Sequence, residues 1–400
     1  MKKNSRNNRE NARRKALQAR SRQTRLTVGI DLGDEWSYCC FLDDQGEIVE
    51  ECRVKTTREA MKGRFGELKE ALMAIEVGAH SRWVSQLLSE LGHEVIVANA
   101  RELRAITGSD RKSDRVDAEK LARYARVDPK ILRPLRHRGE AAQVDLLVLR
   151  GRAVLVKIRT QIVNSVRGMV KSFGYRMPAC STEKFAQLKN LAPAQIKESL
   201  APMMEALEQV QKKIEEYDER VKKLATEKYP ETKVLRQVWG VGEITTVSFV
   251  LTLEDKERFG KSREVGPYLG LRPRRNQSSE SDPELRITKA GDCFLRSLLV
   301  ECAQKILSEK APDTALKQFG KRIEARGKKK AKKRAIVAVA RKLAVLLHKL
   351  WVTGEVYEPF PGEPRSARPL KQPESPPRWE VKTGSAIRRT TTLESATKRN

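Results

Sequence analysis

The fold of this chain is decided by Thr27-Val28-Gly29-Ile30-Asp31-Leu32-Gly33. Its apolar residues predict a buried strand, because strands covered on both faces are near-continuous hydrophobic runs. Asp31 comes at the end of that strand, and the carboxyl ends of strands are where α/β sheets place their chemistry. One acid is a weak indication, so its meaning depends on which other acids the chain brings to the same edge.

Strands and helices alternate after this stretch. The expected elements are strand 37–42, strand 48–54, helix 57–72, strand 72–75, helix 81–91 and strand 94–97. The turn between the first two has the hairpin composition Asp43-Asp44-Gln45-Gly46. Three antiparallel strands followed by alternating helices and strands favour a ribonuclease-H-like mixed sheet over a doubly wound Rossmann sheet.

The composition indicates a polyanionic partner. Lys and Arg number 81 against 52 Asp and Glu, a formal net charge of +29. Each neutralised phosphate releases counterions, so nucleic acid is the favoured partner, and a merely soluble or ribosome-associated basic protein is the alternative. No apolar run approaches the roughly 20 residues that span a bilayer, and no signal peptide precedes Asp31. We therefore expect a cytoplasmic, nucleoid-associated protein without a membrane partner.

The six cysteines and four histidines are scattered along the chain. Their spacing fits neither a zinc site nor a disulfide framework, and it gives little support to a histidine-activated nucleophile. Any metal must therefore be held by carboxylates, which favours Mg²⁺ or Mn²⁺.

Three later acids can join Asp31. Glu76 ends the strand at 72–75, and Asp114 and Asp117 lie one turn apart at the start of a helix for which Ser113 is a suitable N-cap. Acids in a first helical turn also suit the helix dipole, which is the structural alternative. In a ribonuclease-H-like sheet these positions can converge, and four carboxylates that close together need a hard cation to neutralise them.

Two long helices are expected in the middle of the chain. The first runs over about 140–173, and Gly174 and Pro178 end it. The second has a regular a/d seam made of Leu200, Met203, Leu207, Val210, Ile214, Tyr217, Val221 and Leu224. Such a seam joins subunits or packs against the preceding helix, and we expect association into a dimer or tetramer.

A glycine-containing turn opens the C-terminal part. Val238-Trp239-Gly240-Val241-Gly242 resembles a helix-hairpin-helix, in which Gly240 and Gly242 free a tight turn whose N–H groups can bind a phosphate. An ordinary turn between two helices is the alternative. The basic residues 1–25 and the Pro-, Ser-, Thr- and Arg-rich residues 359–400 are expected to be disordered.

Several short words of this sequence occur, in the same order, in a known family. Over about residues 26–358 the chain resembles the DEDD-type transposases of the insertion-sequence-110 family, also described as bridge-RNA-guided recombinases. The matching words are Val28-Gly29-Ile30-Asp31, Ile75-Glu76-Val77-Gly78, Lys112-Ser113-Asp114-Arg115-Val116-Asp117-Ala118, Val238-Trp239-Gly240-Val241-Gly242, Gly270-Leu271-Arg272-Pro273, Ile287-Thr288-Lys289-Ala290-Gly291-Asp292, Leu295-Arg296 and Ala340-Arg341-Lys342-Leu343. No single word is specific, whereas the ordered set is.

The resemblance implies an α/β plus α fold. A RuvC-like catalytic domain over 26–135 would carry the four acids, a coiled-coil helical middle over 136–230 would mediate association, and a mainly helical transposase domain over 231–358 would carry a nucleophilic serine. Asp31, Glu76, Asp114 and Asp117 would be the catalytic metal ligands.

The family's serine follows the Gly-Leu-x-Pro word. Spacing from Pro273 places it at Ser278, and Ser279 is the alternative because it stands where the family has glycine. The nearby cations expected to bind nucleic acid are Arg272, Arg274, Arg275, Lys289 and Arg296. The implied activity is transposition by site-specific DNA recombination, guided by an RNA from the element. A metal-assisted serine would form a covalent phosphoserine, with acids and serine drawn from one subunit or from two.

Three other functions fit parts of the pattern. A Holliday-junction resolvase-like nuclease would use the same acids with water in place of serine. An actin-like or sugar-kinase phosphotransferase is disfavoured, because we find no second phosphate loop of the Asp-Gly-Gly type. A non-catalytic nucleic-acid-binding protein would need only the positive charge.

Overall fold

The computed structural model describes residues 15–21, 23–99, 113–278, 281, 283, 285–327 and 330–360. The chain forms two compact units, which divide between Arg150 and Gly151. The expected middle segment, 136–230, is thus shared between the two units. Residues 361–400, most of the expected C-terminal tail, lie outside the described part.

The first unit is built on a five-stranded mixed sheet. Its strands are β1 (Thr27–Asp31), β2 (Trp36–Leu42), β3 (Ile48–Lys55), β4 (Leu72–Glu76) and β5 (Glu94–Ala98). They lie in the order β3-β2-β1-β4-β5, with β1, β2 and β3 antiparallel and β1, β4 and β5 parallel. The expected mixed sheet is confirmed, and its topology is compatible with a RuvC-like fold.

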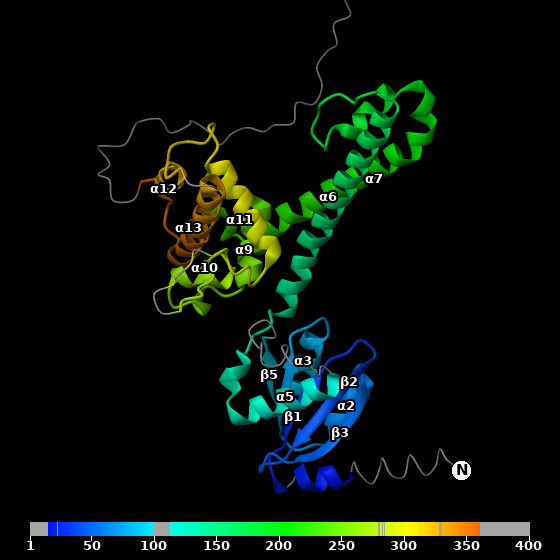
Figure 1. The fold of residues 1–400 in the computed structure, drawn as a ribbon, viewed down its shortest axis with the longest axis vertical. Helices are drawn as coiled ribbons and strands as arrows, with labels where there is room; N and C mark the ends of the chain where they lie inside the picture. Colours follow the sequence, from blue (N-terminus) through cyan, green and yellow to red (C-terminus); the bar gives the residue numbers. More distant parts are fainter. Residues whose placement is uncertain are drawn as a thin grey trace, which may run out of the picture. The chain divides into compact units, whose positions relative to one another are not determined.

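Helices cover both faces of this sheet. One face packs against α2 (Arg58–Phe65) and α3 (Ser81–Glu90), where Val28 and Ile30 join a buried apolar cluster with Phe65. The opposite face packs against α5 (Asp114–Val127), which crosses the sheet (Figure 1). Because side chains alternate along a strand, Gly29 faces α5 while its two neighbours face the other layer.

Gly29 lets α5 lie directly on the sheet. A Cβ atom at this position would come within 2.0 Å of the Ala118 carbonyl oxygen and 2.5 Å of the Ala122 nitrogen. No side chain fits there, so the glycine sets the distance between the first strand and the helix that carries two of the candidate acids.

The expected disordered arm at 1–25 contains a short helix in the structure. Residues 15–21 are helical, and Leu17, 1% exposed, packs into the α2 and α3 side of the core. Arg20 also pairs with Asp43 at 2.6 Å. One apolar residue in a basic run is enough to pack a short helix against the apolar surface that the sheet, α2 and α3 form. Local composition does not predict such packing, because the surface comes from other parts of the chain. Residues 1–14 lie outside the described part.

Two long helices pack antiparallel in the middle of the chain. They are α6 (Glu140–Ser172) and α7 (Ala194–Lys223). Arg152 donates to Asp218 at 2.5 Å, and Arg159 donates to Gln211 at 2.8 Å, so the numbering runs in opposite directions on the two helices. Leu200 and Leu207 of the seam share a buried cluster with Val163, Val166 and Val170. Two buried residues of the seam thus pack against the chain's own helix, the alternative that the sequence leaves open, and subunit association stays a prediction.

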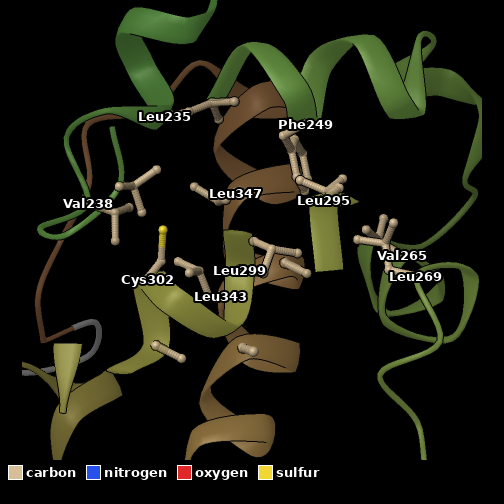
Figure 2. Close-up of a cluster of buried hydrophobic side chains, with 14 of the residues drawn as sticks. Leu235, Val238, Phe249, Val265, Leu269, Leu295, Leu299, Cys302, Leu343 and Leu347 are labelled. Carbon is tan, nitrogen blue, oxygen red and sulfur yellow. The ribbon is translucent and has the colours of Figure 1, made fainter. Parts of the chain in front are cut away.

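The C-terminal part is mainly helical, as expected. Its helices are α8 (Thr232–Leu235), α9 (Glu243–Leu253), α10 (Val265–Tyr268), α11 (Cys293–Ile306), α12 (Ala315–Glu324) and α13 (Ala331–Thr353). Every residue of α9 from Thr245 onward is buried, so this helix lies in the interior. Figure 2 shows Phe249 of α9 converging with Leu295, Leu299 and Leu347 in the core. Among the helices of the described part, none has the length and apolarity to cross a membrane.

Candidate functional site

Asp31 and Glu76 end neighbouring parallel strands. Ile30 is paired with Ile75 in the β1–β4 register, so the two acids follow at adjacent positions. Asp31 shares a sheet face with Gly29, and Glu76 shares one with Ala74, which packs in the α5 cluster. Both half-buried carboxylates therefore lie on the α5 side, at the carboxyl edge of the sheet.

The start of α5 points to the same edge. Near the helix's other end, Arg126 donates to the Asp44 carbonyl at 2.6 Å and Arg123 to the Gly46 carbonyl at 3.2 Å. The loop with these carbonyls follows Leu42, which pairs with Thr27, so it lies at the amino end of β1. The first turn of α5, which carries Asp114 and Asp117, is therefore directed towards the carboxyl edge. Ser113 caps this turn, as expected, by accepting from the Val116 N–H at 3.4 Å.

Asp117 is the most enclosed of the four acids. It is 6% exposed, and its buried Oδ1 has no hydrogen-bond partner within the described residues. A buried carboxylate oxygen without a partner is costly unless a cation satisfies it. Asp114, one turn earlier, is exposed.

The donor set fits a hard divalent cation. Carboxylate oxygens are the ligands that Mg²⁺ and Mn²⁺ prefer, and Asp117 offers a buried oxygen for one. In the conformation described, no three acidic, histidine or cysteine side chains of the described residues are grouped closely enough to hold a metal. The backbone thus brings the four acids to one edge, and their closure around a metal stays a prediction.

A histidine that the sequence analysis left unassigned links the two loops at this edge. Trp83 Nε1 donates to His80 Nδ1 at 3.1 Å, which leaves Nε2 to face Asp34 Oδ1 at 3.3 Å. Asp34 follows Asp31 by three residues, and His80 follows Glu76 by four. Because β1 and β4 are adjacent and parallel, residues that follow them by three and four positions can meet. This similar spacing is the sequence signal that could have identified the pair.

Ser278 lies near the tip of an irregular hairpin, residues 270–289, which we call the serine arm. Arg274 N donates to the Arg286 carbonyl at 2.9 Å, and Thr288 N donates to the Arg272 carbonyl at 2.9 Å. At the tip, Ser278 and Ser281 exchange backbone hydrogen bonds of 3.0 and 2.9 Å. Ser278 is exposed, and Ser279 lies outside the described residues.

Glycine and arginine fix the base of the serine arm. Gly270 has φ +69°, and a Cβ there would come within 2.3 Å of the Ala290 nitrogen. Arg296, predicted to bind nucleic acid, donates through Nη1 to the carbonyls of Leu269 at 3.0 Å and Ala290 at 2.6 Å. Arg296 therefore anchors the arm, and the predicted contact with nucleic acid has to compete with these bonds.

The other four predicted cations lie on the surface of the serine arm. Arg272, Arg274, Arg275 and Lys289 are all exposed. Arg275 donates to Gln277 beside Ser278. The arm therefore presents positive charge on both sides of the candidate serine, an arrangement suited to binding phosphate.

The helix-hairpin-helix-like turn has a shorter first helix than its name implies, because α8 has a single turn. Gly240 has φ +85°, and Gly242 is the exposed N-cap of α9, with open space where a Cβ would be. Together with Trp239, both glycines line a groove of about 1130 Å³ within the second unit. Phosphate binding at this turn stays a prediction.

Comparison with known proteins gives the family. A transposase model of the DEDD type, from the IS110 group, matches residues 28–174, which include all four acids. A second model, described as "Transposase IS116/IS110/IS902 family", matches residues 232–319, which include the serine arm. The chain belongs to the IS110 family of DEDD transposases.

Curated relatives of this IS110-family chain are also named transposases. The transposase for insertion sequence element IS1111A of Coxiella burnetii is 26% identical over 82% of this chain and 90% of its own length. A probable family 20 transposase of Pseudomonas aeruginosa is 25% identical over 70% of this chain and 83% of its own. The transposase for insertion sequence element IS1328 of Yersinia enterocolitica is 26% identical over 69% of this chain and 82% of its own length.

The IS110-family chain therefore carries its candidate groups in two places. Asp31, Glu76, Asp114 and Asp117 belong to the first unit, and Ser278 with its cations belongs to the second. The strand ends and the helix cap could be predicted from residue pattern, whereas the anchoring role of Arg296 has no sequence signal.

Proposed function

We propose that this IS110-family transposase cuts and rejoins DNA through a Ser278 nucleophile, with the four acids as metal ligands and a guide RNA that selects the sites. The proposal rests first on Asp117. The Asp117 carboxylate is buried, and its Oδ1 has no hydrogen-bond partner among the residues that the structure describes. Because β1 and β4 end in acids at the same edge, a cation bound there would offset the cost of burying this oxygen.

The serine arm supplies the second half of the proposal. Serine is a poor nucleophile until a base or metal activates it and cations neutralise the phosphate. Arg272, Arg274 and Arg275 provide that positive charge. A divalent cation held by the acids would lower the pKa of the attacking hydroxyl and stabilise the leaving oxygen.

The reaction then has two balanced steps. In the first, Ser278 Oγ gives its proton to a carboxylate and bonds to phosphorus, while the bond from phosphorus to one deoxyribose oxygen breaks and the leaving oxygen takes up that proton to become a hydroxyl. In the second, a hydroxyl of the partner DNA end gives up its proton and bonds to phosphorus, while the bond from phosphorus to Ser278 Oγ breaks and the serine oxygen takes up that proton. The acids and the serine meet within one subunit or between two.

Adduct trapping tests the serine. Wild-type protein is incubated with DNA of the element's ends and Mg²⁺, denatured, and analysed for covalently bound DNA. We expect an adduct in wild type and in Ser281→Ala, a matched control on the same hairpin, but none in Ser278→Ala. Loss in Ser279→Ala with retention in Ser278→Ala would move the nucleophile by one residue. DNA cleavage that persists in both Ser278→Ala and Ser279→Ala, without any covalent adduct, would favour the water-dependent nuclease.

RNA guidance is tested on the nucleic acid that copurifies. The net charge of +29 favours binding of RNA of any sequence, so binding alone is not informative. The informative result is the sequence of the RNA that copurifies. We expect one discrete structured RNA encoded next to the gene, and its removal should abolish site-specific cleavage while nonspecific DNA binding remains. A mixture of bulk cellular RNA, with cleavage unaffected by its removal, would contradict guidance.

A further inference from the structure

Two cysteines lie side by side on neighbouring strands of the first unit's sheet. Cys39 on β2 and Cys52 on β3 are direct partners in the antiparallel register. Directly opposite residues in such a pair have Cα atoms roughly 4.5–5.5 Å apart, and a disulfide takes Cα separations of about 4.4–6.8 Å. The backbone therefore already holds the two residues at a distance that a disulfide can bridge.

The two thiols differ in accessibility and in charge. Cys39 is buried, whereas Cys52 lies on the edge strand of the sheet and is half-buried. A hydrogen bond to Cys52 and burial raise the pKa of Cys39 well above its usual value. The same hydrogen bond and the nearby Arg64 charge lower the pKa of Cys52. Both shifts favour Cys52 over Cys39 as the thiol that ionises first.

Arg64 of α2 holds a largely buried cation beside this pair. Its Nη2 lies 3.0 Å from Glu50 Oε2, and its guanidinium stacks over Phe41 at 4.6 Å from the ring centroid. Its Nε has no hydrogen-bond partner within the described residues. A guanidinium fixed in this way favours an anionic sulfur nearby, which is the setting of reactive thiols.

The neighbouring cysteine gives an internal comparison. Cys40 follows Cys39 on β2, but its side chain joins the α5 face of the sheet. Burial raises the pKa of Cys40 to about 12, which disfavours the thiolate form that reacts. Reactivity should therefore separate two adjacent cysteines.

We propose that Cys39 and Cys52 form an oxidisable dithiol pair, in which Cys52 reacts with peroxide and Cys39 resolves the product to an intramolecular disulfide. The Cys52 thiolate attacks one peroxide oxygen: an S–O bond forms, the O–O bond breaks, and hydroxide leaves and is protonated to water. Cys39 sulfur then attacks the Cys52 sulfenic acid, so that an S–S bond forms, the S–O bond breaks, and a second water leaves. Two thiols lose two electrons in total, and hydrogen peroxide takes them up.

Mass spectrometry of the full chain tests the pair. The reduced protein is titrated with hydrogen peroxide, alkylated, and mapped by fragmentation of its peptides. We expect a Cys39–Cys52 link at peroxide concentrations that leave Cys40 and Cys302 reduced, and its reversal by a thiol reductant. A Cys40→Ser variant removes the ambiguity of two adjacent cysteines and should form the same link.

A trapping variant separates the two roles. In Cys39→Ser the sulfenic acid of Cys52 has no resolving thiol, so dimedone should label Cys52 there and not in wild type. In Cys52→Ser no label should appear at Cys39. The proposal is overturned if wild type gives no Cys39–Cys52 link under peroxide, or if Cys40 is oxidised as readily as Cys52.

Discussion

At the scale of single residues, Gly29 has the sharpest steric requirement. In Gly29→Ala the new methyl would meet α5 backbone at 2.0 Å, so the helix must move off the strand. We expect the free energy of unfolding to fall by about 1–3 kcal/mol or more, as in overpacked cores. Urea denaturation followed by circular dichroism measures it.

Gly78→Ala is the matched control for this substitution. A Cβ at Gly78 would meet nothing within 4 Å, so we expect a change of no more than about 0.5 kcal/mol. Equal effects of the two alanines would contradict the direct packing of α5 on β1.

Asp117 makes a prediction about metal dependence. If a cation satisfies its buried oxygen, Mg²⁺ or Mn²⁺ binds the folded state alone and raises the melting temperature as its concentration rises. Asp117→Asn removes the charge that holds the metal, so we expect a flat response from this variant in calorimetry.

Glu119→Gln serves as the control on the same helix. Glu119 pairs with Arg123 at 2.8 Å and is not one of the four candidate ligands. It should keep the metal response of wild type, and loss of the response in both variants would indicate a general effect of charge on α5.

Residue types at strand ends and caps could be predicted well, because their chemistry is local. Asp31, Glu76 and Ser113 fall where strand and helix patterns place them. The link from His80 to Asp34 is harder to predict, because its two members are 46 residues apart and their similar offsets become informative only once β1 and β4 are known to pair. Arg296 reads as a surface cation until the carbonyls at the arm's base are in place.

At the scale of elements, His93 ties the end of α2 to the start of β4. Its Nδ1 accepts from Ala71 N at 3.2 Å, and its Nε2 donates to the Phe65 carbonyl at 3.1 Å, an arrangement of the neutral ring. Burial lowers the pKa of His93 below its ordinary value of about 6.5.

This histidine predicts how stability changes with pH. Between the lowered folded pKa and about pH 6.5 the unfolded state binds more protons, so stability is full above pH 6.5 and falls as the pH drops below it. The slope for one proton is at most about 1.4 kcal/mol per pH unit. Denaturation midpoints at pH 7.5 and 5.5 should differ more for wild type than for His93→Gln, and equal differences would exclude His93 as the source.

The packing of α6 on α7 makes a second prediction at this scale. Leu207 is 1% exposed in the cluster between the two helices, so Leu207→Ala should lower the free energy of unfolding by about 2–5 kcal/mol. The molar mass from light scattering should stay that of wild type. A fall in mass at unchanged stability would instead assign the seam to subunit association.

The elements that could be predicted are those with a long periodic pattern. A heptad seam gives the same sequence signal whether its partner is another helix of the chain or another subunit, so the sequence alone does not distinguish the two. The helix at 15–21 has one apolar anchor, Leu17, which is too little for periodicity to detect.

At the scale of the whole molecule, the positive charge sets nucleic-acid affinity. We expect binding to nonspecific duplex DNA to weaken by about 10³-fold or more from 50 to 200 mM salt, if six or more phosphates are contacted. Arg274→Ala and Arg275→Ala should each reduce the salt slope by about one if each contacts a phosphate. Asp31→Asn, which removes a candidate ligand, should leave the slope unchanged. Fluorescence anisotropy across a salt series measures all of these.

The serine arm has a further consequence for how this sequence can change over generations. Its two strands are joined through main-chain groups, and its base is fixed by Gly270 and Arg296. Side chains towards the tip can therefore be exchanged with little cost to folding. An exposed side chain of the arm, such as Ser278 or Arg275, that related sequences nevertheless keep would be kept for its chemistry and not for folding.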